Sequence, residues 1–274
     1  SNVALVGGVF ANVRLNQVIH ELPNVDKIYV FPGMGDEGLA VGAAYAEWIK
    51  EEQRGNRPVR SYQPKHVYFG RGFEADEIEA ALKEKELAYE HYDEIEKPVA
   101  RLLSEGKVVA RYNGRMEYGP RALGHRSILY QPTDPSVNDW LNKRLVRTEF
   151  MPFAPVTLAE KTDQCYEDID GARHAARFMT ITFQCTDWMK ENCPAVVHID
   201  GTARPQIVSQ ELDDDYYRIV NEYFKITGLP CVINTSFNMH EEPIVCTPHD
   251  AIRAFQMGHL DVLAIGDYLV IISD

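Results

Sequence analysis

Basic side chains gather in one stretch of the chain, between Lys107 and Phe150. That stretch holds eight Lys or Arg and four Asp or Glu, a local charge of about +4, whereas the whole chain of 274 residues carries −13. The planar fork of an arginine pairs with two phosphate oxygens at once, so a positive cluster inside an acidic protein is typical of a pocket for a small polyanion. After Lys107, the basic residues are Arg111, Arg115, Arg121, Arg126, Lys143, Arg144 and Arg147.

Glycine and proline set the shape of the same stretch. In NGRMEYGPRALGHR, arginines alternate with residues that stiffen the backbone or let it approach a ligand closely, which favours anion binding over a solvated surface. Arg204 follows the turn HIDGT, and NTSFN places Asn234 and Ser236 at the end of a strand. The polar groups of NTSFN either contact the ligand or cap the next element. We predict that Arg115, Arg121 and Arg204 share one cavity.

Two loops nearer the start of the chain allow a binding role and a simpler structural one. Gly7 and Gly8 lie where a strand turns into a helix, so their backbone N–H groups either face a phosphate or ribose or only form a tight turn. Asp36, in GMGDEG, either ligates a hard metal or caps the following helix. The residues alone leave both choices open.

Composition and missing motifs argue against several classes of function. The histidines lack HxH and HxxxH spacing, and neither GxSxG nor GxxxxGK[ST] occurs, so a serine nucleophile and a P-loop are not indicated. The acidic charge disfavours duplex nucleic acid, which needs a broad basic face. No apolar run approaches the roughly 18 residues of a membrane span. Five scattered cysteines indicate free thiols in a reducing cytoplasm.

The pattern of elements that must position these residues predicts two units. Residues 1–60 have a β-α-β-α pattern, with strands at 3–10 and 27–32, and are expected to be a fragment of a larger layer. Residues 52–66 are polar, contain prolines and mark the boundary. From residue 66 onward helices and strands alternate, which predicts an α/β or α+β domain with a mixed sheet.

Within the second unit, apolar periodicity and cap signals locate the elements. Helices are expected at 74–86, 94–106, 135–146, 212–227 and 247–257. Strands are expected at 88–92, 107–114, 154–160, 178–185, 195–200, 203–209, 230–236 and 262–272. Asp134 is the expected cap of the third of these helices, with Pro135 near its first position, and Thr247 the cap of the last. The strand at 107–114 leads directly into the arginine-rich loop.

Taken together, the motifs resemble the O-carbamoyltransferases of the nodulation-protein and antibiotic-biosynthesis type. The matching segments cover essentially the whole chain in order: GGVFANVRLN, VFPGMGDEGLAVGAA, NGRMEYGPRALGHRSIL, RTEFMPFAP, DGTARPQ, and NTSFN with EPIVCTPHDAI. The resemblance implies a YrdC-like domain with a mixed twisted sheet at 66–274. It implies that residues 1–60 are the truncated tail of an actin-like domain.

The resemblance also implies a division of the chemistry. The YrdC-like domain would make carbamoyladenylate from carbamoyl phosphate and ATP with Mg²⁺. The actin-like domain would bind this intermediate through Fe²⁺ and pass the carbamoyl group to a hydroxyl of a sugar or antibiotic. Asp36 matches the family's aspartate ligand of the iron, and its two histidine partners belong to the N-terminal domain that precedes residue 1 in the family.

The expected site residues follow from the loops and the resemblance. Phosphate contacts are expected from Arg115, Arg121, Lys143, Arg147 and Arg204. Nucleotide or carbamoyl contacts are expected from Gly7, Gly8, Asn12, Arg126, Asn234 and Ser236. Two alternatives remain: a non-catalytic nucleotide- or RNA-end-binding module of the same fold, and a threonylcarbamoyl-adenylate synthase, in which the GDEG tail is not expected. The apolar strands of 1–60 further predict a homo-oligomer.

Overall fold

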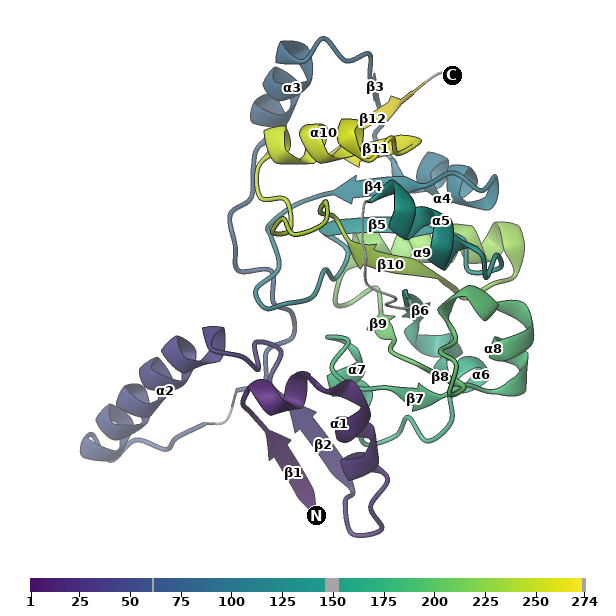
Figure 1. Ribbon diagram of the computed structural model, residues 1–274. Helices are drawn as coiled ribbons and strands as arrows, with labels where there is room; N and C mark the ends of the chain where they lie inside the picture. Colours follow the sequence, from purple (N-terminus) through teal and green to yellow (C-terminus); the bar gives the residue numbers. More distant parts are fainter. Residues whose placement is uncertain (61, 146–152, 273–274) are drawn as a thin grey trace.

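An eight-stranded mixed sheet forms the centre of the second unit (Figure 1). The protein is described by a computed structural model over residues 1–60, 62–145 and 153–272. The strand order is β3-β12-β11-β4-β5-β10-β6-β9, with parallel and antiparallel neighbours. The strands are β3 (Glu90–His91), β4 (Val109–Tyr112), β5 (Arg126–Tyr130), β6 (Ala154–Leu158), β9 (Gln206–Val208), β10 (Cys231–Ser236), β11 (Val262–Ile265) and β12 (Tyr268–Ile271). The predicted α/β class with a mixed sheet is confirmed.

Helices cover both faces of this sheet because successive strand residues point to opposite sides. On β4, Val109 packs in the cluster that contains residues of α4 and α9, whereas Ala110 packs in the cluster that contains residues of α3, α5 and α10. These helices are α3 (Ala75–Glu84), α4 (Glu96–Ser104), α5 (Val137–Arg144), α9 (Asp214–Thr227) and α10 (Pro248–Met257). The sheet is therefore buried on both sides, and its strand ends are left to form a site.

A smaller subdomain is inserted between β6 and β9. It contains a short two-stranded sheet and several single-turn helices (Figure 1). Its elements are η2 (Ala159–Lys161), α6 (Thr162–Cys165), α7 (Arg173–Ala176), β7 (Phe183–Gln184), α8 (Asp187–Asn192), η3 (Pro194–Val196) and β8 (Thr202–Ala203). The turn between β8 and β9 carries Arg204.

The first unit packs against this subdomain. Its elements are β1 (Asn2–Leu5), η1 (Gly8–Ala11), α1 (Val13–His20), β2 (Lys27–Val30) and α2 (Glu37–Arg54). The Ile28 N–H donates to the Gly171 carbonyl at 3.0 Å, and the Asn16 side chain donates to the Thr180 carbonyl at 2.7 Å. The strands β1 and β2 are parallel, while α2 projects away from the body (Figure 1).

Helices whose capping residues are evident in the sequence begin and end close to the predicted positions. In α10, Thr247 accepts from the Asp250 N–H, and the Asp250 carboxylate accepts from the Thr247 N–H, with Pro248 in the first turn. Asp213 caps α9, which ends at Gly228 in a left-handed conformation. Helix α5 is shorter than expected, because Asp134 forms a turn with the Ser136 N–H and the helix begins only at Val137.

Several expected strands are not strands. Of residues 178–185 only Phe183–Gln184 pair in a sheet, and 195–200 begin in a 3₁₀ turn and contain no strand. Residues 178–183 and 195–196 are buried in the inserted subdomain, which accounts for their apolar side chains. Residues 262–272 form two antiparallel strands that reverse at Gly266, and Arg126–Tyr130, expected as loop, is the buried strand β5. In the described ranges, no helix combines the length and apolar character needed to cross a bilayer.

Candidate active site

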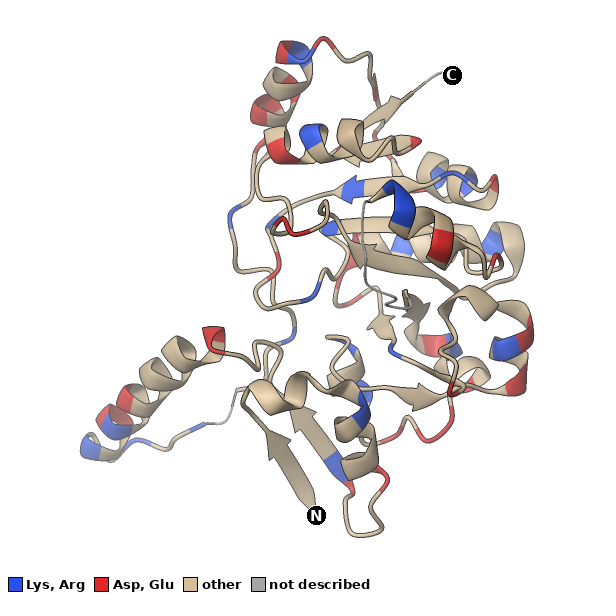
Figure 2. Ribbon diagram, in the orientation of Figure 1, with Lys and Arg blue, Asp and Glu red and all other residues tan. Residues whose placement is uncertain are grey.

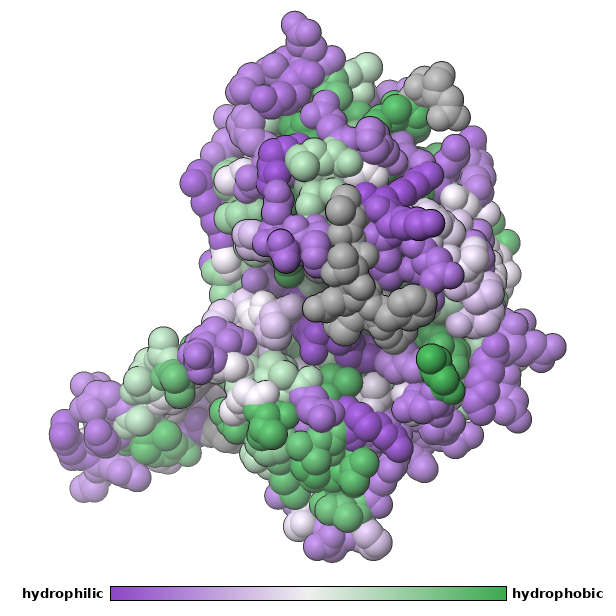
Figure 3. Space-filling view, in the orientation of Figure 1, coloured by the Kyte–Doolittle hydropathy of each residue, from purple (hydrophilic) through white to green (hydrophobic). Residues whose placement is uncertain are grey.

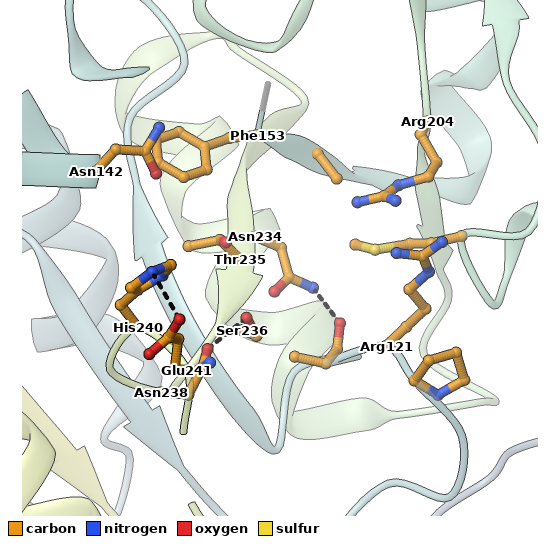
Figure 4. A pocket seen from close by; sticks show the side chains of 14 residues that line it. Arg121, Asn142, Phe153, Arg204, Asn234, Thr235, Ser236, Asn238, His240 and Glu241 are labelled. Atoms are coloured by element: carbon orange, nitrogen blue, oxygen red, sulfur yellow. Dashed lines mark hydrogen bonds and ion pairs between the residues drawn. The ribbon is translucent and has the colours of Figure 1, made fainter. Parts of the chain in front are cut away.

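A cavity of about 230 Å³ lies at the junction of the main sheet and the inserted subdomain (Figure 4). Three segments distant in sequence supply most of its walls: the loop at 120–122, the β8–β9 turn, and the end of β10 with the loop that follows. The lining residues are Pro120, Arg121, Ala122, Asn142, Phe153, Ala154, Met179, Arg204, Asn234, Thr235, Ser236, Asn238, His240 and Glu241. The cavity thus unites the predicted GPR, ARP and NTSFN motifs.

Two arginines form one side of the cavity. Figure 4 shows the guanidinium groups of Arg121 and Arg204 next to each other. Burial lowers the pKa of Arg204 to about 9, and the neighbouring charge of Arg121 lowers it further in the same direction. Burial also lowers the pKa of Arg121, whose Nε is buried without a hydrogen-bond partner among the described residues. Both charges are thus poorly solvated and lie side by side, an arrangement that an anion would stabilise.

The other side of the cavity is polar. Ser236 Oγ donates to Asn238 Oδ1 at 2.6 Å, and Asn238 Nδ2 donates to the carbonyl of Glu242 at 2.9 Å. His240 lies 3.8 Å from the Glu241 carboxylate, measured between Nε2 and Oε1 (Figure 4). One end of a ligand would therefore meet paired positive charge, and the other would meet amide, hydroxyl and imidazole groups.

Asn234 lies between these two sides, buried at the end of β10. Its Nδ2 donates to the carbonyl of Ala122 at 3.3 Å and to Gln206 Oε1 at 2.7 Å. Its Oδ1 is buried and has no hydrogen-bond partner within the described part of the chain. An unpaired buried acceptor costs free energy, so this oxygen is suited to a donor brought by a ligand.

The loop that carries Arg121 is held from behind by a buried carboxylate. Glu117 Oε1 accepts from the backbone N–H groups of Leu123, His125 and Arg126 at 2.7, 2.9 and 3.2 Å. Gly124 has φ 116°, and a Cβ at that position would overlap the ring of Tyr216. The loop is therefore fixed in one conformation before any ligand binds.

Arg115 and Arg126 lie outside the cavity, so the expected convergence holds for Arg121 and Arg204 but not for Arg115. The Arg115 guanidinium donates to the carbonyls of Gly70 and Phe69 at 2.9 and 2.8 Å. Arg126 is completely buried on β5, where it donates to the carbonyls of Asn113 and Gly114 and lies over the Tyr112 ring. Both side chains donate to backbone carbonyls. A guanidinium group uses the same N–H donors for this as for binding phosphate.

The other basic residues of the stretch are spread over separate elements (Figure 2). Lys143 is exposed on α5 and is absent from the cavity lining, although Asn142 beside it belongs to that lining. Arg111, on β4, donates to the carbonyl of Gly124 at 2.6 Å and so anchors the loop that carries Arg121 to the sheet. Arg147 lies outside the described residues. The charge cluster in the sequence is therefore not one surface patch.

Of the predicted ligand groups of the first unit, Asn12, Gly7 and Gly8 have structural roles here, whereas Asp36 does not cap its helix. Asn12 caps α1, its side chain accepting from the Leu15 N–H at 3.0 Å. Gly7 and Gly8 form the entry to η1, and Gly7 has φ 115°. Asp36 is exposed at the first position before α2 and makes no side-chain cap there. Among the described residues, no group of three His, Cys, Asp or Glu side chains is arranged to hold a metal.

Sequence reasoning missed the residues that support the arginines. Glu117, Gln206 and Asp213 are buried or partly buried polar side chains, and each contacts the loop or its neighbours. The available signal was the position of Glu117 in RMEYGPR and of Gln206 in ARPQ, each next to a predicted binding arginine. Their roles depend on contacts across the sheet, which spacing along the chain does not reveal.

Two protein-family models match the chain. The model described as the carbamoyltransferase C-terminus matches residues 100–271, which include the whole cavity, and that of the carbamoyltransferase N-terminus matches residues 1–45. The chain belongs to the carbamoyltransferase family. In this carbamoyltransferase chain, residues 1–45 therefore correspond to the N-terminal region of the family, and the sheet that carries the site corresponds to the C-terminal region.

Relatives extend over almost the whole chain. Nodulation protein NolO of Bradyrhizobium diazoefficiens is 35% identical over 98% of this chain and 49% of its own length. An uncharacterized protein of Methanocaldococcus jannaschii is 38% identical over 98% of this chain and 44% of its own. Nodulation protein U of Sinorhizobium fredii is 33% identical over 87% and 40%. The chain spans roughly half the length, or less, of these curated relatives.

Solved structures overlap the chain in part. Full-length HypF in a phosphate- and nucleotide-bound form covers 65% of this chain and 22% of its own, with a TM-score of 0.45 and 18% identity. A variant of P. abyssi Sua5 covers 63% of this chain and 45% of its own, with a TM-score of 0.42 and 12% identity.

Proposed function

We propose that residues 66–274 form the carbamoyladenylate-forming domain of an ATP-dependent O-carbamoyltransferase. The observation that carries the proposal is the pair Arg121 and Arg204, both partly buried and without a carboxylate partner among the described residues, in a cavity that also presents Asn234 and Ser236. Family membership supports carbamoyl transfer as the chemistry. In the whole protein, the carbamoyl group would pass to a hydroxyl of a sugar or antibiotic-like acceptor.

The proposed reaction concentrates negative charge. Water releases phosphate from carbamoyl phosphate, and the resulting carbamate oxygen attacks the α-phosphate of ATP. A new P–O bond then forms as the bond to pyrophosphate breaks, giving carbamoyladenylate, pyrophosphate and phosphate. Catalysis of such a step consists mainly of positioning and charge neutralisation, and it requires no nucleophilic side chain. Two arginines held side by side would neutralise the transferred phosphoryl group and the departing phosphates.

The remaining lining residues have matching roles in this proposal. The unpaired Asn234 Oδ1 would accept a hydrogen bond from the carbamoyl amide, and the Ser236 hydroxyl would exchange its bond to Asn238 for one to a carbonyl or phosphate oxygen of the ligand. Lys143 remains a proposed phosphate contact, because α5 borders the cavity through Asn142. Arg147, outside the described residues, remains a proposed contact on the sequence and the resemblance. Arg115 and Arg126 are assigned structural roles instead.

The described residues fit a magnesium-bound nucleotide better than a resident iron. Mg²⁺ usually binds substrate phosphates with one or two carboxylates, and Glu241 provides a carboxylate in the cavity lining. Mg²⁺ bound in this way would supply additional charge neutralisation. Asp36 is a single exposed carboxylate, and no three-residue metal group occurs among the described residues, so no step is assigned to iron here.

The test is pyrophosphate release from ATP by the purified chain, measured with and without carbamoyl phosphate. We expect release that depends on carbamoyl phosphate and that is lost in Arg121→Ala. Stabilisation by ATP without any turnover would favour the nucleotide-binding module. Release that requires threonine and bicarbonate, and not carbamoyl phosphate, would favour a threonylcarbamoyl-adenylate synthase.

A further inference from the structure

Gln206 is a buried amide at the start of β9, 3% exposed, and both ends of its side chain are hydrogen-bonded. Its Nε2 donates to the carbonyl of Leu123 at 2.7 Å. Its Oε1 accepts from Asn234 Nδ2 at 2.7 Å. These two bonds fix the orientation of the amide, because a carbonyl can only accept and an NH₂ can only donate.

The partners of Gln206 belong to the three segments that build the cavity. Leu123 follows Arg121 by two residues, and Gln206 itself follows Arg204 by two residues. Pro205 lies between Arg204 and Gln206 and restricts the backbone there, so a shift of Gln206 would be passed to Arg204. Asn234 completes the link at the end of β10. One amide therefore connects the backbone positions of both arginines.

Other contacts secure the same loop but do not connect the two arginines. The Leu123 carbonyl also accepts from the Tyr68 hydroxyl at 3.0 Å, and Ala122 accepts from Asn234 at 3.3 Å. Glu117 accepts from the Leu123 N–H and Arg111 donates to the Gly124 carbonyl, so both hold the loop that follows Arg121 without reaching the segment of Arg204. Among the hydrogen bonds of the described side chains, the bond from Gln206 to Leu123 joins the strand that follows Arg204 directly to the loop that follows Arg121.

We infer that Gln206 is a positioning residue that sets the spacing between Arg121 and Arg204, so that both guanidinium groups bind one polyphosphate together. The inference rests on the proposed function, because it concerns the same anion site. Two poorly solvated positive charges repel each other, so their separation must be imposed by the surrounding structure. Without the bridging amide, each arginine would still reach the cavity, but the two would no longer act on the same ligand.

The experiment is a double-mutant cycle on pyrophosphate binding, measured by calorimetry with the full chain. Arg121→Met, Arg204→Met and the double variant are compared in the wild-type background and in Gln206→Leu, which keeps the volume and removes both hydrogen bonds. Thr157→Val is the matched control, because it deletes a buried hydrogen bond to the Tyr166 hydroxyl on β6, the strand beside β9, and leaves both bonds of Gln206 in place.

We expect the arginines to be coupled by about tenfold in Kd in the wild-type and Thr157→Val backgrounds, and by less than about threefold in Gln206→Leu. A purely structural role would lower the melting temperature of Gln206→Leu and leave the coupling intact, and that result would overturn the inference. Absence of pyrophosphate binding, or of coupling, in the wild-type background would instead refute the proposed anion site.

Discussion

At the scale of the residue, burial of a charged side chain without a counter-ion costs free energy that folding must supply elsewhere. Arg121 and Arg204 combine this cost with mutual repulsion, which is reflected in the lowered pKa of each. No described carboxylate forms an ion pair with either residue, although such pairs are common elsewhere on this acidic chain. Retention of two unfavourable charges in one cavity is the behaviour expected of a binding site.

Arg121→Ala should therefore lower activity without lowering stability. The loop is preorganised by Glu117 and Gly124, so the guanidinium loses little freedom on binding phosphate. Loss of one such contact costs about 2–4 kcal/mol of transition-state stabilisation, roughly 30- to 1,000-fold in rate. The measurement is carbamoyl-phosphate-dependent ATP turnover alongside thermal unfolding, with the exposed Arg101→Ala as the control. Unchanged turnover would exclude Arg121 from the site.

Arg204→Met should raise the melting temperature of the ligand-free protein. Methionine fills a similar volume and removes both the burial cost and the repulsion from Arg121, so a gain of roughly 0.5–2 kcal/mol is expected. The same variant should lose the stabilisation that pyrophosphate gives to the wild type. Thermal unfolding with and without pyrophosphate measures both effects. A variant that is less stable than wild type without ligand, yet still stabilised by pyrophosphate, would contradict this account.

Of the four expected phosphate ligands that the structure describes, Arg121 and Arg204 line the cavity and the other two do not. For Arg115, the reason lies in the versatility of arginine. A guanidinium binds phosphate oxygens and backbone carbonyls with the same donors. Arg121 follows Pro120 on a loop that faces the cavity. Arg126 belongs to strand β5, which was not predicted because the preceding sequence is rich in glycine. Which role an arginine takes depends on where neighbouring strands end, and this is decided by distant pairing.

At the scale of the element, the start of α9 connects helix capping to the site. Asp213 accepts from the Tyr216 N–H at 3.1 Å and from the Tyr68 hydroxyl at 2.8 Å, and lies 3.4 Å from His125 Nε2. Burial alone would raise the pKa of Asp213, but the hydrogen bond with His125 and the charge of Arg111 hold this pKa well below its usual range. The carboxylate thus stabilises the fold most when it is ionised.

The lowered pKa of Asp213 determines how the stability of the fold depends on pH. A carboxylate with a lowered pKa contributes stability above its unfolded pKa, and this contribution is lost as the pH falls below about 4. Asp213→Asn keeps the cap and removes the charge, so we expect a loss of about 1.5–3 kcal/mol at pH 7 that shrinks toward pH 3. Urea unfolding at both pH values measures it. An equal loss at both would show that ionisation of Asp213 does not matter.

Elements with local signals were predicted more accurately than elements defined by pairing. The predicted cap Thr247 begins α10, and the helix expected at 212–227 ends at Thr227 as predicted, because caps involve residues within one turn. The segment 178–185 has the apolar alternation of a strand, but most of it has no neighbouring strand in the inserted subdomain. Burial explains its composition, and only the arrangement of the whole subdomain decides that it does not form a sheet.

At the scale of the whole molecule, the first unit exposes much apolar surface. Figure 3 shows hydrophobic atoms gathered over β1 and α1, where Val6, Val9 and Val18 are exposed. A groove of about 810 Å³ beside α2 is lined by many apolar and aromatic side chains, among them Tyr45 and Trp48. Surfaces of this kind usually mark an interface.

We expect the chain to self-associate through this groove and the adjoining surface, as the sequence predicted. Static light scattering over a concentration series should show a rising mean mass. Trp48→Glu should reduce the association, whereas Ile226→Glu, at an exposed position of α9 remote from the groove, should not. A constant monomer mass for the wild type would contradict the expectation.

The strand order of the main sheet has a consequence for how the protein is made. β11 pairs with β4, although Val262 leaves the ribosome about 150 residues after Val109, its partner in the register. At ordinary rates of synthesis, β4 and β5 would wait on the order of 10–30 s for this neighbour. During that interval the edge of β4 that will pair with β11 is open to pairing with another nascent chain. Association with holding chaperones during translation, followed by closure of the sheet only after β11 and β12 emerge, is the expected course of folding in the cell.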